Sequence, residues 1–180
     1  LRHQDSAMYF RQRRDHYAVG SYRHEPVLVE PDDIATHDAA ADMPANREFN
    51  HAMFAPAMGE AIAMLPELAN VTLAEAMNGM FSFTPDGFPL LGEAGAVRGF
   101  WTAAAVWITH AGGVAKTVAE WLTSGPPSLD LHECDLNRFE PFALTPAYLR
   151  QRAAQQYREV YDIIHPLQPL AEPRPLRLSP

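Results

Sequence analysis

The sequence predicts an α+β fold: an antiparallel sheet, then the last strand and helix of an α/β domain, and finally an extended, proline-rich C-terminal connector. The first observation behind this prediction is a hairpin pattern near the N-terminus. Two aromatic-rich runs, residues 7–13 and 16–22, flank the charged residues Arg14 and Asp15, and such runs are typical of paired strands joined by a tight turn. The chain should therefore open with two antiparallel strands that have one partly polar face.

The second observation is an apolar run that leads into a helix. Residues 99–107 are almost continuously apolar, which suits a strand covered on both faces. Residues 111–113 (Ala-Gly-Gly) should break this strand, and residues 114–122 have helical spacing. The Gly-Pro-Pro sequence that begins at Gly125 should end the helix.

The third observation is that the C-terminal part combines a helix with an extended tail. Residues 144–161 carry a helical pattern, with Thr145 as the expected N-cap and Pro146 at the first helical position. Prolines then recur to the end of the chain, which predicts an extended connector rather than core. These prolines are Pro166, Pro169, Pro173, Pro175 and Pro180.

The middle of the chain predicts loops, a helical stretch and a return strand. Residues 30–46 are acidic and loop-like, with room for one short helical turn. Residues 49–65 have helical spacing across Pro56, and because proline is poorly tolerated inside a helix, we expect two helices or one kinked helix, with Pro56 beginning the second part. Pro66 should close this stretch, and residues 71–83 are expected to form an extended strand.

Composition excludes several classes of protein. The formal charge is −8, from 14 basic and 22 acidic residues, and no basic run is interleaved with aromatics, so nucleic acid is not an expected partner. The longest apolar run, around residues 103–108, is far shorter than the roughly twenty residues that a membrane span needs. We therefore expect a cytoplasmic protein without a membrane partner. The single cysteine, Cys134, excludes an internal disulfide.

Two segments carry a resemblance to a known family. Residues 84–92 (Thr-Pro-Asp-Gly-Phe-Pro-Leu-Leu-Gly) and 110–116 (His-Ala-Gly-Gly-Val-Ala-Lys) together resemble the C-terminal part of the flavin domain in the FAD-dependent dimethylglycine oxidase, dimethylglycine dehydrogenase and sarcosine dehydrogenase family. Within this family, the segments resemble those of bacterial dimethylglycine oxidase. The likeness covers nearly the whole chain, and its further segments are residues 17–22, 130–140, 144–148 and 159–169.

This resemblance implies a domain organisation. Residues 1–83 would form part of a substrate-binding domain with an antiparallel sheet, residues 84–125 the C-terminal part of an FAD-binding domain, and residues 126–180 a connector toward a folate-binding, aminomethyltransferase-like region. The chain contains no GxGxxG for the ADP half of a dinucleotide and opens at Leu1 without an initiator methionine. We therefore expect a part of a longer protein, with tetrahydrofolate bound only outside these residues.

The resemblance also implies cofactor-binding residues at the start of the expected helix. A reduced flavin carries negative charge near N1 and the C2 carbonyl, and the N–H groups and positive dipole end of a helix N-terminus can stabilise it. Glycines would let the ring approach the backbone. Taken alone, the segment would rather favour an ordinary strand-to-helix turn with glycines for packing. The expected FAD-binding residues are Tyr17, His110, Gly112, Gly113, Val114, Ala115, Lys116 and Thr117.

Tyr17 and Arg13 are the catalytic candidates. Tyr17 matches a family tyrosine beside the flavin, where a phenol could bind substrate or relay a proton, although cross-strand packing is an equally good explanation. Arg13 stands where the related oxidase has a histidine. This difference puts an acid/base role in doubt, but an arginine could bind a substrate carboxylate, or it could be a solvated hairpin residue.

Other polar residues favour structural roles. Asp86 lies in Pro-Asp-Gly, which predicts a turn without catalytic chemistry, although the segment could also lie near the flavin. His132 and Cys134 have no second pair at metal-binding spacing. We therefore expect no metal site.

The implied reaction is oxidation of an amine at its N-methyl group. A hydride equivalent passes to flavin N5, an iminium remains, and the one-carbon unit goes to folate in the full protein. Dimethylglycine is the expected substrate, with sarcosine or another N-methyl amino acid as the alternative. The expected partners are this small molecule and the rest of the parent chain. The competing hypothesis is a non-catalytic interaction or scaffold module.

Overall fold

The computed structural model describes residues 1–36 and 43–160, which fall into two compact units. The hairpin unit comprises residues 1–27 and 48–78 with the start of the C-terminal segment at 157–160, and the strand–helix unit comprises residues 28–47 and 79–156. The described residues contain three α-helices and small antiparallel sheets. The predicted α+β mixture is confirmed at this level.

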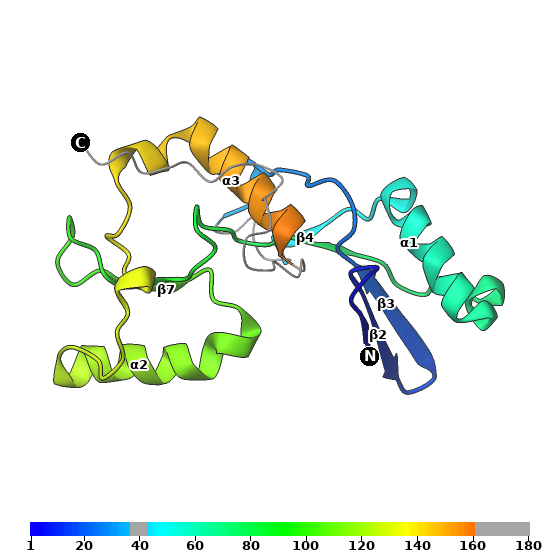
Figure 1. The fold of residues 1–180 in the computed structure, drawn as a ribbon, viewed down its shortest axis with the longest axis horizontal. Helices are drawn as coiled ribbons and strands as arrows, with labels where there is room; N and C mark the ends of the chain where they lie inside the picture. Colours follow the sequence, from blue (N-terminus) through cyan, green and yellow to red (C-terminus); the bar gives the residue numbers. More distant parts are fainter. Residues whose placement is uncertain (37–42, 161–180) are drawn as a thin grey trace. The chain divides into compact units, whose positions relative to one another are not determined.

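The hairpin unit is built on three antiparallel strands. They are β1 (Arg2–His3), β2 (Met8–Arg13) and β3 (His16–Ser21), in the spatial order β1-β2-β3; Figure 1 shows β2 and β3 as a hairpin. Strands β2 and β3 pair from Met8 opposite Ser21 to Arg13 opposite His16. Arg14 takes a left-handed backbone conformation with φ of 57°, which closes the tight turn. The predicted hairpin is confirmed.

The core of this unit lies between the hairpin and a helix. Met8 and Phe10 are buried while Tyr9 between them is exposed, as strand alternation requires. The helix α1 (His51–Met64) contributes Ala57 and Ala61 to the same apolar cluster. Leu68, from the 3-10 helix η3 (Pro66–Asn70), completes it. The local pattern of alternation in the hairpin therefore fixes which face packs on α1.

Helix α1 runs through Pro56 without ending. Of the two predicted alternatives, two separate helices are therefore wrong, and a single helix through Pro56 forms. Ala57 and Ala61 both lie in the buried cluster, and this packing offsets the backbone hydrogen bond that a proline cannot donate. The side chain of Asn50 caps the helix by accepting a hydrogen bond from the Met53 amide at 3.0 Å. The helix closes immediately before Pro66, as predicted.

Short elements connect the two main parts of the fold. The acidic segment contains the predicted helical turn, a 3-10 helix η1 (Pro31–Asp33). A minimal two-stranded sheet is formed by β4 (Asn46–Arg47) and β5 (Asn78–Gly79). The extended strand expected over residues 71–83 is wrong apart from β5. Val71, Leu73 and Met77 are exposed, so this stretch has no packed face to hold it in a sheet.

The strand–helix unit contains an antiparallel pair, β6 (Leu90–Glu93) and β7 (Trp101–Ala104), with Leu90 opposite Ala104. The long buried strand expected over residues 99–107 is wrong. The strand spans only four residues, and Ala103 and Ala104 are exposed. Ala105, with φ of 54°, turns the chain out of the strand, and among the described residues only β6 pairs with β7.

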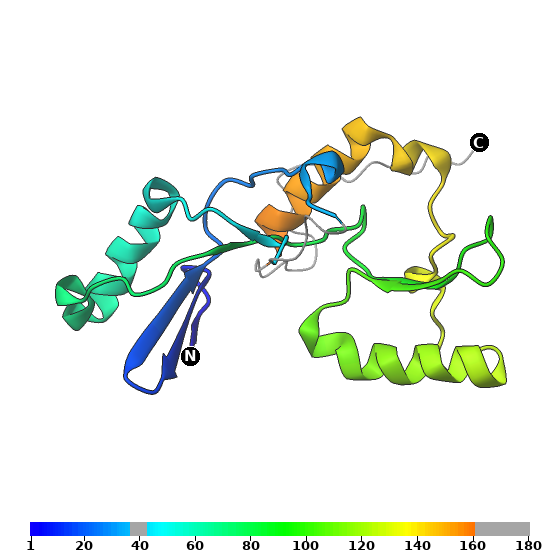
Figure 2. The ribbon, with the colours of Figure 1, turned by 180° about the vertical axis from the view of Figure 1, so that it is seen from behind.

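The chain then passes through a 3-10 turn, η4 (Ile108–His110), directly into the helix α2 (Ala111–Ser124). Figure 2 shows this helix running alongside the short strand pair of the same unit. Gly112 and Gly113 therefore belong to the first turn of the helix and do not break a strand, so the expected start at Val114 is wrong. The predicted end at Gly125 is confirmed.

Helix α2 packs on β6 through a tryptophan. The Trp121 ring lies against Gly92, where an added Cβ would come within 2.8 Å of the indole. Gly92 has φ of 112°, a conformation that side chains rarely adopt. The Trp121 ring also meets Trp101 of β7 edge to face, with centroids 5.4 Å apart. These contacts fix the helix against the strand pair.

The remaining described elements are two 3-10 helices, η5 (His132–Cys134) and η6 (Pro141–Leu144), and the helix α3 (Pro146–Glu159). Pro146 opens α3 as predicted. The Thr145 carbonyl accepts the first helical hydrogen bond from Leu149 at 2.9 Å, which puts Thr145 at the predicted N-cap position, and its hydroxyl donates to the Phe142 carbonyl at 2.9 Å. The proline-rich tail lies outside the described residues. Within the described part, no helix has the length and apolar content that crossing a bilayer requires.

Candidate functional site

The start of α2 brings most of the predicted cofactor residues together. The helical backbone begins at Ile108, where η4 leads into α2, and the His110 amide donates to the Trp107 carbonyl at 2.9 Å. The side chains or Cα atoms of His110, Gly112 and Gly113 are exposed. The amides of His110 and Ala111 donate within the η4 turn, and the positive end of the helix dipole faces an accessible surface.

Gly112 and Gly113 have open space where a side chain would stand. A Cβ built on either residue meets no atom of the described residues within 4 Å outside the helix's own backbone. Glycine in a helix costs roughly 0.5–1 kcal/mol relative to alanine. Packing within the described part of the chain therefore does not require these glycines.

The next turn of α2 has one buried side and one exposed side. Val114 is half-buried, and Thr117 is buried and donates its hydroxyl to the Gly113 carbonyl at 2.8 Å. Ala115 is exposed. Thr117 therefore holds the glycine turn from the buried side of the helix, and Ala115 is exposed to solvent.

Lys116 carries the only full positive charge of the predicted cofactor-binding set. Its ammonium donates to the Glu120 carboxylate one turn along α2, and this hydrogen bond lowers the pKa of Glu120. The pair is exposed, so it contributes little to stability. Lys116 can reach an anion at the helix start only by leaving Glu120.

An aromatic cluster that the sequence analysis missed lies beside the helix start. Phe81, Phe83 and Trp107 have ring centroids 5.4 to 5.9 Å apart, and Trp107 is the residue before η4. The signal was present in the spacing of Phe81 and Phe83, which places both rings on one side of an extended chain. Aromatic surface and the positive end of the helix dipole therefore occur together at this end of α2.

The Thr-Pro-Asp-Gly segment forms the predicted turn. The Gly87 amide donates to the Thr84 carbonyl at 3.2 Å, and Gly87 has φ of 82°, which favours glycine. The Asp86 carboxylate accepts hydrogen bonds from the Thr84 hydroxyl and from the Phe88 amide, each at 3.1 Å. These bonds explain the sequence of this turn without catalysis.

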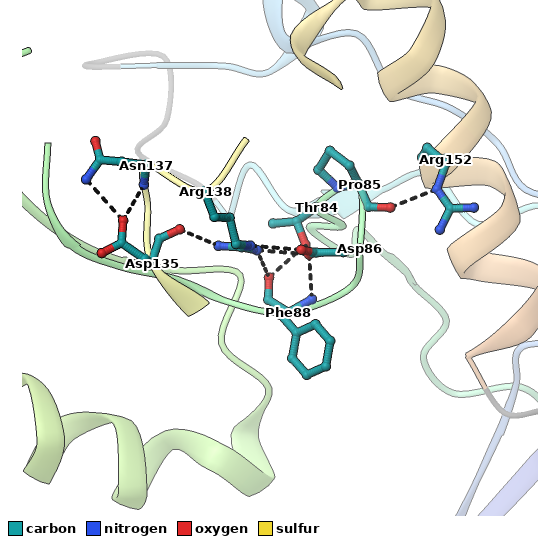
Figure 3. Close-up of polar contacts among 8 residues, drawn as sticks. All are labelled: Thr84, Pro85, Asp86, Phe88, Asp135, Asn137, Arg138 and Arg152. Atoms are coloured by element: carbon teal, nitrogen blue, oxygen red, sulfur yellow. Dashed lines mark hydrogen bonds and ion pairs between the residues drawn. The ribbon is translucent and has the colours of Figure 1, made fainter. Parts of the chain in front are cut away.

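Arg138 binds this turn from a distant part of the chain. Its guanidinium donates to both oxygens of Asp86, Nε to Oδ2 at 2.8 Å and Nη2 to Oδ1 at 2.9 Å. It also donates to the carbonyls of Phe88 at 3.0 Å and Asp135 at 2.9 Å, as Figure 3 shows. The sequence does not indicate this pair, because a separation of 52 residues leaves no local pattern.

The electrostatics of Asp86 argue against a general base. Burial, the largest single effect, favours the neutral acid. However, hydrogen bonds from Arg138, the Phe88 amide and Thr84, with the charge of Arg138, outweigh burial and lower the pKa of Asp86 below its ordinary value. A carboxylate stabilised in this way accepts a proton poorly near neutral pH.

Tyr17 and Arg13 lie in the hairpin unit, on opposite faces of its two strands. Tyr17 stands opposite Gln12, and Arg13 stands opposite His16. Cross-strand partners share a face and neighbours along a strand do not, so Tyr17 projects on the face of Phe10 and Arg13 on the other. Tyr17 is 60% exposed, beyond the packed core. Their catalytic roles stay predictions.

His132 and Cys134 show no arrangement for binding a metal. The His132 ring is hydrogen-bonded to Asp130 at 2.9 Å, and this carboxylate raises the pKa of His132. Burial raises the pKa of the half-buried Cys134 thiol. Within residues 1–36 and 43–160, no three His, Cys, Asp or Glu side chains gather as a set of ligands.

Comparison with known proteins identifies the family. A model described as FAD dependent oxidoreductase matches residues 1–121, which is more than half of the chain. The chain belongs to the FAD dependent oxidoreductase family. A second model, the FAD dependent oxidoreductase central domain, matches residues 124–179.

Curated relatives include human mitochondrial sarcosine dehydrogenase, 29% identical over 92% of this chain and 18% of that protein. Human mitochondrial dimethylglycine dehydrogenase is 29% identical over 87% of this chain and 18% of that protein. The 4-methylaminobutanoate oxidase (formaldehyde-forming) of Paenarthrobacter nicotinovorans is 28% identical over 98% of this chain and 21% of that protein. The chain thus spans about a fifth of the length of these relatives, and the resemblance found in the sequence is confirmed.

Proposed function

We propose that these residues are a segment of a longer FAD-dependent amine oxidoreductase, and that the start of α2 binds the flavin ring. The observation that carries this proposal is the pair Gly112 and Gly113, two exposed glycines in a helical first turn with open space above them. Family membership and relatives named for N-methylated amines support it.

The residues at this site fit a flavin. The helix start offers a positive dipole end to the electron-rich edge of the ring. The aromatic cluster of Phe81, Phe83 and Trp107 offers flat apolar surface nearby. Bound FAD would accept the hydride when the N-methyl carbon of the substrate is oxidised.

The chain's own residues would perform distinct tasks at this site. Thr117 holds the Gly113 carbonyl and keeps the first turn regular. Lys116 would exchange Glu120 for the developing negative charge. The catalytic roles predicted for Tyr17 and Arg13 belong to the hairpin unit and are separate proposals: Tyr17 would position or deprotonate a substrate amine, or Arg13 would bind a substrate carboxylate. Because Tyr17 and Arg13 project from opposite faces of the hairpin, they cannot hold one small substrate together, and we expect turnover to fall strongly in only one of Tyr17→Phe and Arg13→Gln.

The first experiment tests the cofactor site without disturbing the fold. In the full-length protein that contains these residues, Gly112→Ala should lower FAD content and affinity, because its methyl group occupies the open space above the helix. Gly59→Ala in α1 is the matched control, since a Cβ there also meets no described atom within 4 Å outside the helix backbone. Both changes should slightly favour the helix. Equal FAD binding by both variants would contradict the proposed site.

The second experiment tests the substrate. We propose dimethylglycine, with sarcosine or another N-methyl amino acid as the alternative, and transfer of the one-carbon unit to tetrahydrofolate outside these residues. Anaerobic addition of N,N-dimethylglycine to the purified full-length protein should bleach the flavin absorbance band. Bleaching by sarcosine alone would change the substrate assignment to sarcosine. If FAD is bound and neither amine bleaches the band, both assignments are contradicted.

A second candidate function has its own support. The chain is 30% identical over 130 residues to the mouse mitochondrial pyruvate dehydrogenase phosphatase regulatory subunit, a relative named for regulation. A non-catalytic interaction module is therefore the alternative. Stable protein that retains no FAD and is unchanged by the Gly112→Ala substitution would favour it.

A further inference from the structure

We propose that Arg138 is a positioning residue for the flavin site. Arg138 holds the turn at residues 84–88 in place, and the turn then determines the position of the start of α2. The inference rests on the proposed function for the identity of the ligand. The coupling between Arg138 and the helix start rests on the hydrogen bonds and ring contacts of the strand–helix unit alone.

The first step is the specificity of the Arg138 contacts. The Arg138 side chain is only 10% exposed, and its guanidinium lies over the Phe139 ring, 4.2 Å from the centroid. It donates to Asp86 with both arms and also to two carbonyls. A planar guanidinium can make this set of bonds at once, whereas a lysine ammonium cannot reproduce the fork.

The second step is the anchoring of Arg138 itself. The chain around it is hydrogen-bonded to β6: the Leu136 amide donates to the Leu91 carbonyl at 2.9 Å, and the Asn137 side chain donates to the Glu93 carbonyl at 2.9 Å. The Gly95 amide donates back to Asn137 at 2.8 Å. Arg138 is thus held on a frame that does not depend on Asp86.

The third step connects the turn to the helix start by two routes. Phe83, directly before the turn, packs against Trp107, the residue that precedes η4. On the other side of the turn, Leu90 pairs with Ala104, and the next residue, Ala105, turns the chain toward the helix. A displaced turn would therefore move both supports of the helix start.

The contact between Arg138 and Asp86 joins stretches that two different family models match. Asp86 lies in the stretch matched by the FAD dependent oxidoreductase model, and Arg138 lies in the stretch matched by the central-domain model. Both belong to the strand–helix unit. The pair thus makes the geometry of the flavin site depend on a residue contributed by the following region of the family.

A matched control exists within the same unit. Arg150 donates to both oxygens of Glu30 at 2.6 and 2.9 Å, so the pair has the same fork geometry. It is exposed, with 51% and 47% of the two side chains accessible, and neither residue contacts the turn or the helix start in any hydrogen bond found among the described residues. Arg150→Gln removes a bidentate pair without touching the route described above.

The test compares Arg138→Gln, Arg138→Lys, Asp86→Asn and Arg150→Gln in the full-length protein. The first readout is amide hydrogen exchange of residues 107–113, which needs no cofactor. We expect faster exchange in Arg138→Gln and Asp86→Asn, partial protection in Arg138→Lys, and the wild-type rate in Arg150→Gln. The double variant of Arg138→Gln with Asp86→Asn should add little to either single change.

The second readout is the flavin. FAD affinity should fall about tenfold or more in Arg138→Gln, because misplacement of a binding group by about 1 Å is costly, and the absorbance spectrum of bound flavin should shift. A lower melting temperature with unchanged exchange at residues 107–113 and unchanged flavin spectrum would overturn the inference. If exchange responds as expected but wild-type protein binds no FAD, the coupling stands and the proposed function fails.

Discussion

Different kinds of interaction stabilise the interior of each of the two units. In the hairpin unit the buried cluster is apolar, built from Met8, Phe10, Ala57, Ala61 and Leu68. In the strand–helix unit half of the buried side chains are polar or charged: Thr84, Thr117, Arg152 and Gln155, beside Pro85, Pro89, Leu91 and Ala143. Arg152, for example, donates to the Pro85 carbonyl at 2.8 Å and to Gln155.

This difference has a functional consequence. Apolar burial is nearly non-directional, so a hydrophobic core holds elements together without fixing each atom. Hydrogen bonds to buried charged groups are directional, and each one fixes the relative position of two segments. The unit that carries the candidate flavin site is therefore the one whose loops are held by specific polar contacts.

The largest expected effect comes from the apolar core. Phe10→Ala should lower the free energy of unfolding by about 3–5 kcal/mol, because it removes transfer free energy and leaves a cavity. Arg11→Ala, an exposed position on the other face of the same strand, is the control and should change little. Urea denaturation followed by far-ultraviolet circular dichroism measures both. Similar costs for the two variants would contradict the face assignment.

The next effect tests the contact between α2 and β6. Gly92→Ala should cost about 1–3 kcal/mol, because the residue must keep a positive φ and its Cβ would lie 2.8 Å from the Trp121 ring. The fluorescence of the tryptophans should change as the indole moves. Gly59→Ala serves again as the control. A stable Gly92→Ala protein with wild-type fluorescence would show that this contact is not tight.

A smaller effect concerns acid stability. The pKa of Asp86 is lower in the folded protein than its ordinary value of 3.8, so its contribution to stability is fully present above this value. That contribution is lost as the pH falls from about 4 through the folded pKa. Asp86→Asn should be less stable than wild type at neutral pH, and the difference should shrink in acid. A constant difference from pH 7 to pH 2.5 would exclude this linkage.

The smallest effect compares two threonines with the same local hydrogen bond. Thr117 and Thr123 each donate their hydroxyl to the carbonyl four residues earlier at 2.8 Å, but only Thr117 is buried. Thr117→Val should cost about 0.5–1.5 kcal/mol, and Thr123→Val should be nearly neutral because water replaces its bond. Thermal unfolding of the two variants makes the comparison, and equal melting temperatures would contradict it.

The sequence predicted well what local patterns determine. The hairpin followed from strand alternation around Arg14 and Asp15, and the ends of α1 and α2 followed from Pro66 and Gly125. Long-range packing decided the rest. Residues 99–107 are apolar enough for a buried strand, yet a strand of four residues forms because the left-handed Ala105 ends it.

The candidate site was predictable in part for the same reason. The glycines at the helix start were found from their spacing and the family resemblance, but their place inside the first turn of α2 was not. The Arg138–Asp86 pair joins residues 52 positions apart, and the cluster of Phe81, Phe83 and Trp107 depends on a fold that brings distant segments together. Neither has a signature in a single local window.

The packing of Trp121 against Gly92 has a consequence for the opposite end of α2. Gly113 and Trp121 are eight residues apart, or about 12 Å along a helix axis. A helix of this length transmits displacement as a stiff rod, so whatever shifts the indole at one end also shifts the glycine turn at the other. The position of a flavin ring at this site would then depend on a residue that it never touches, two turns and more away.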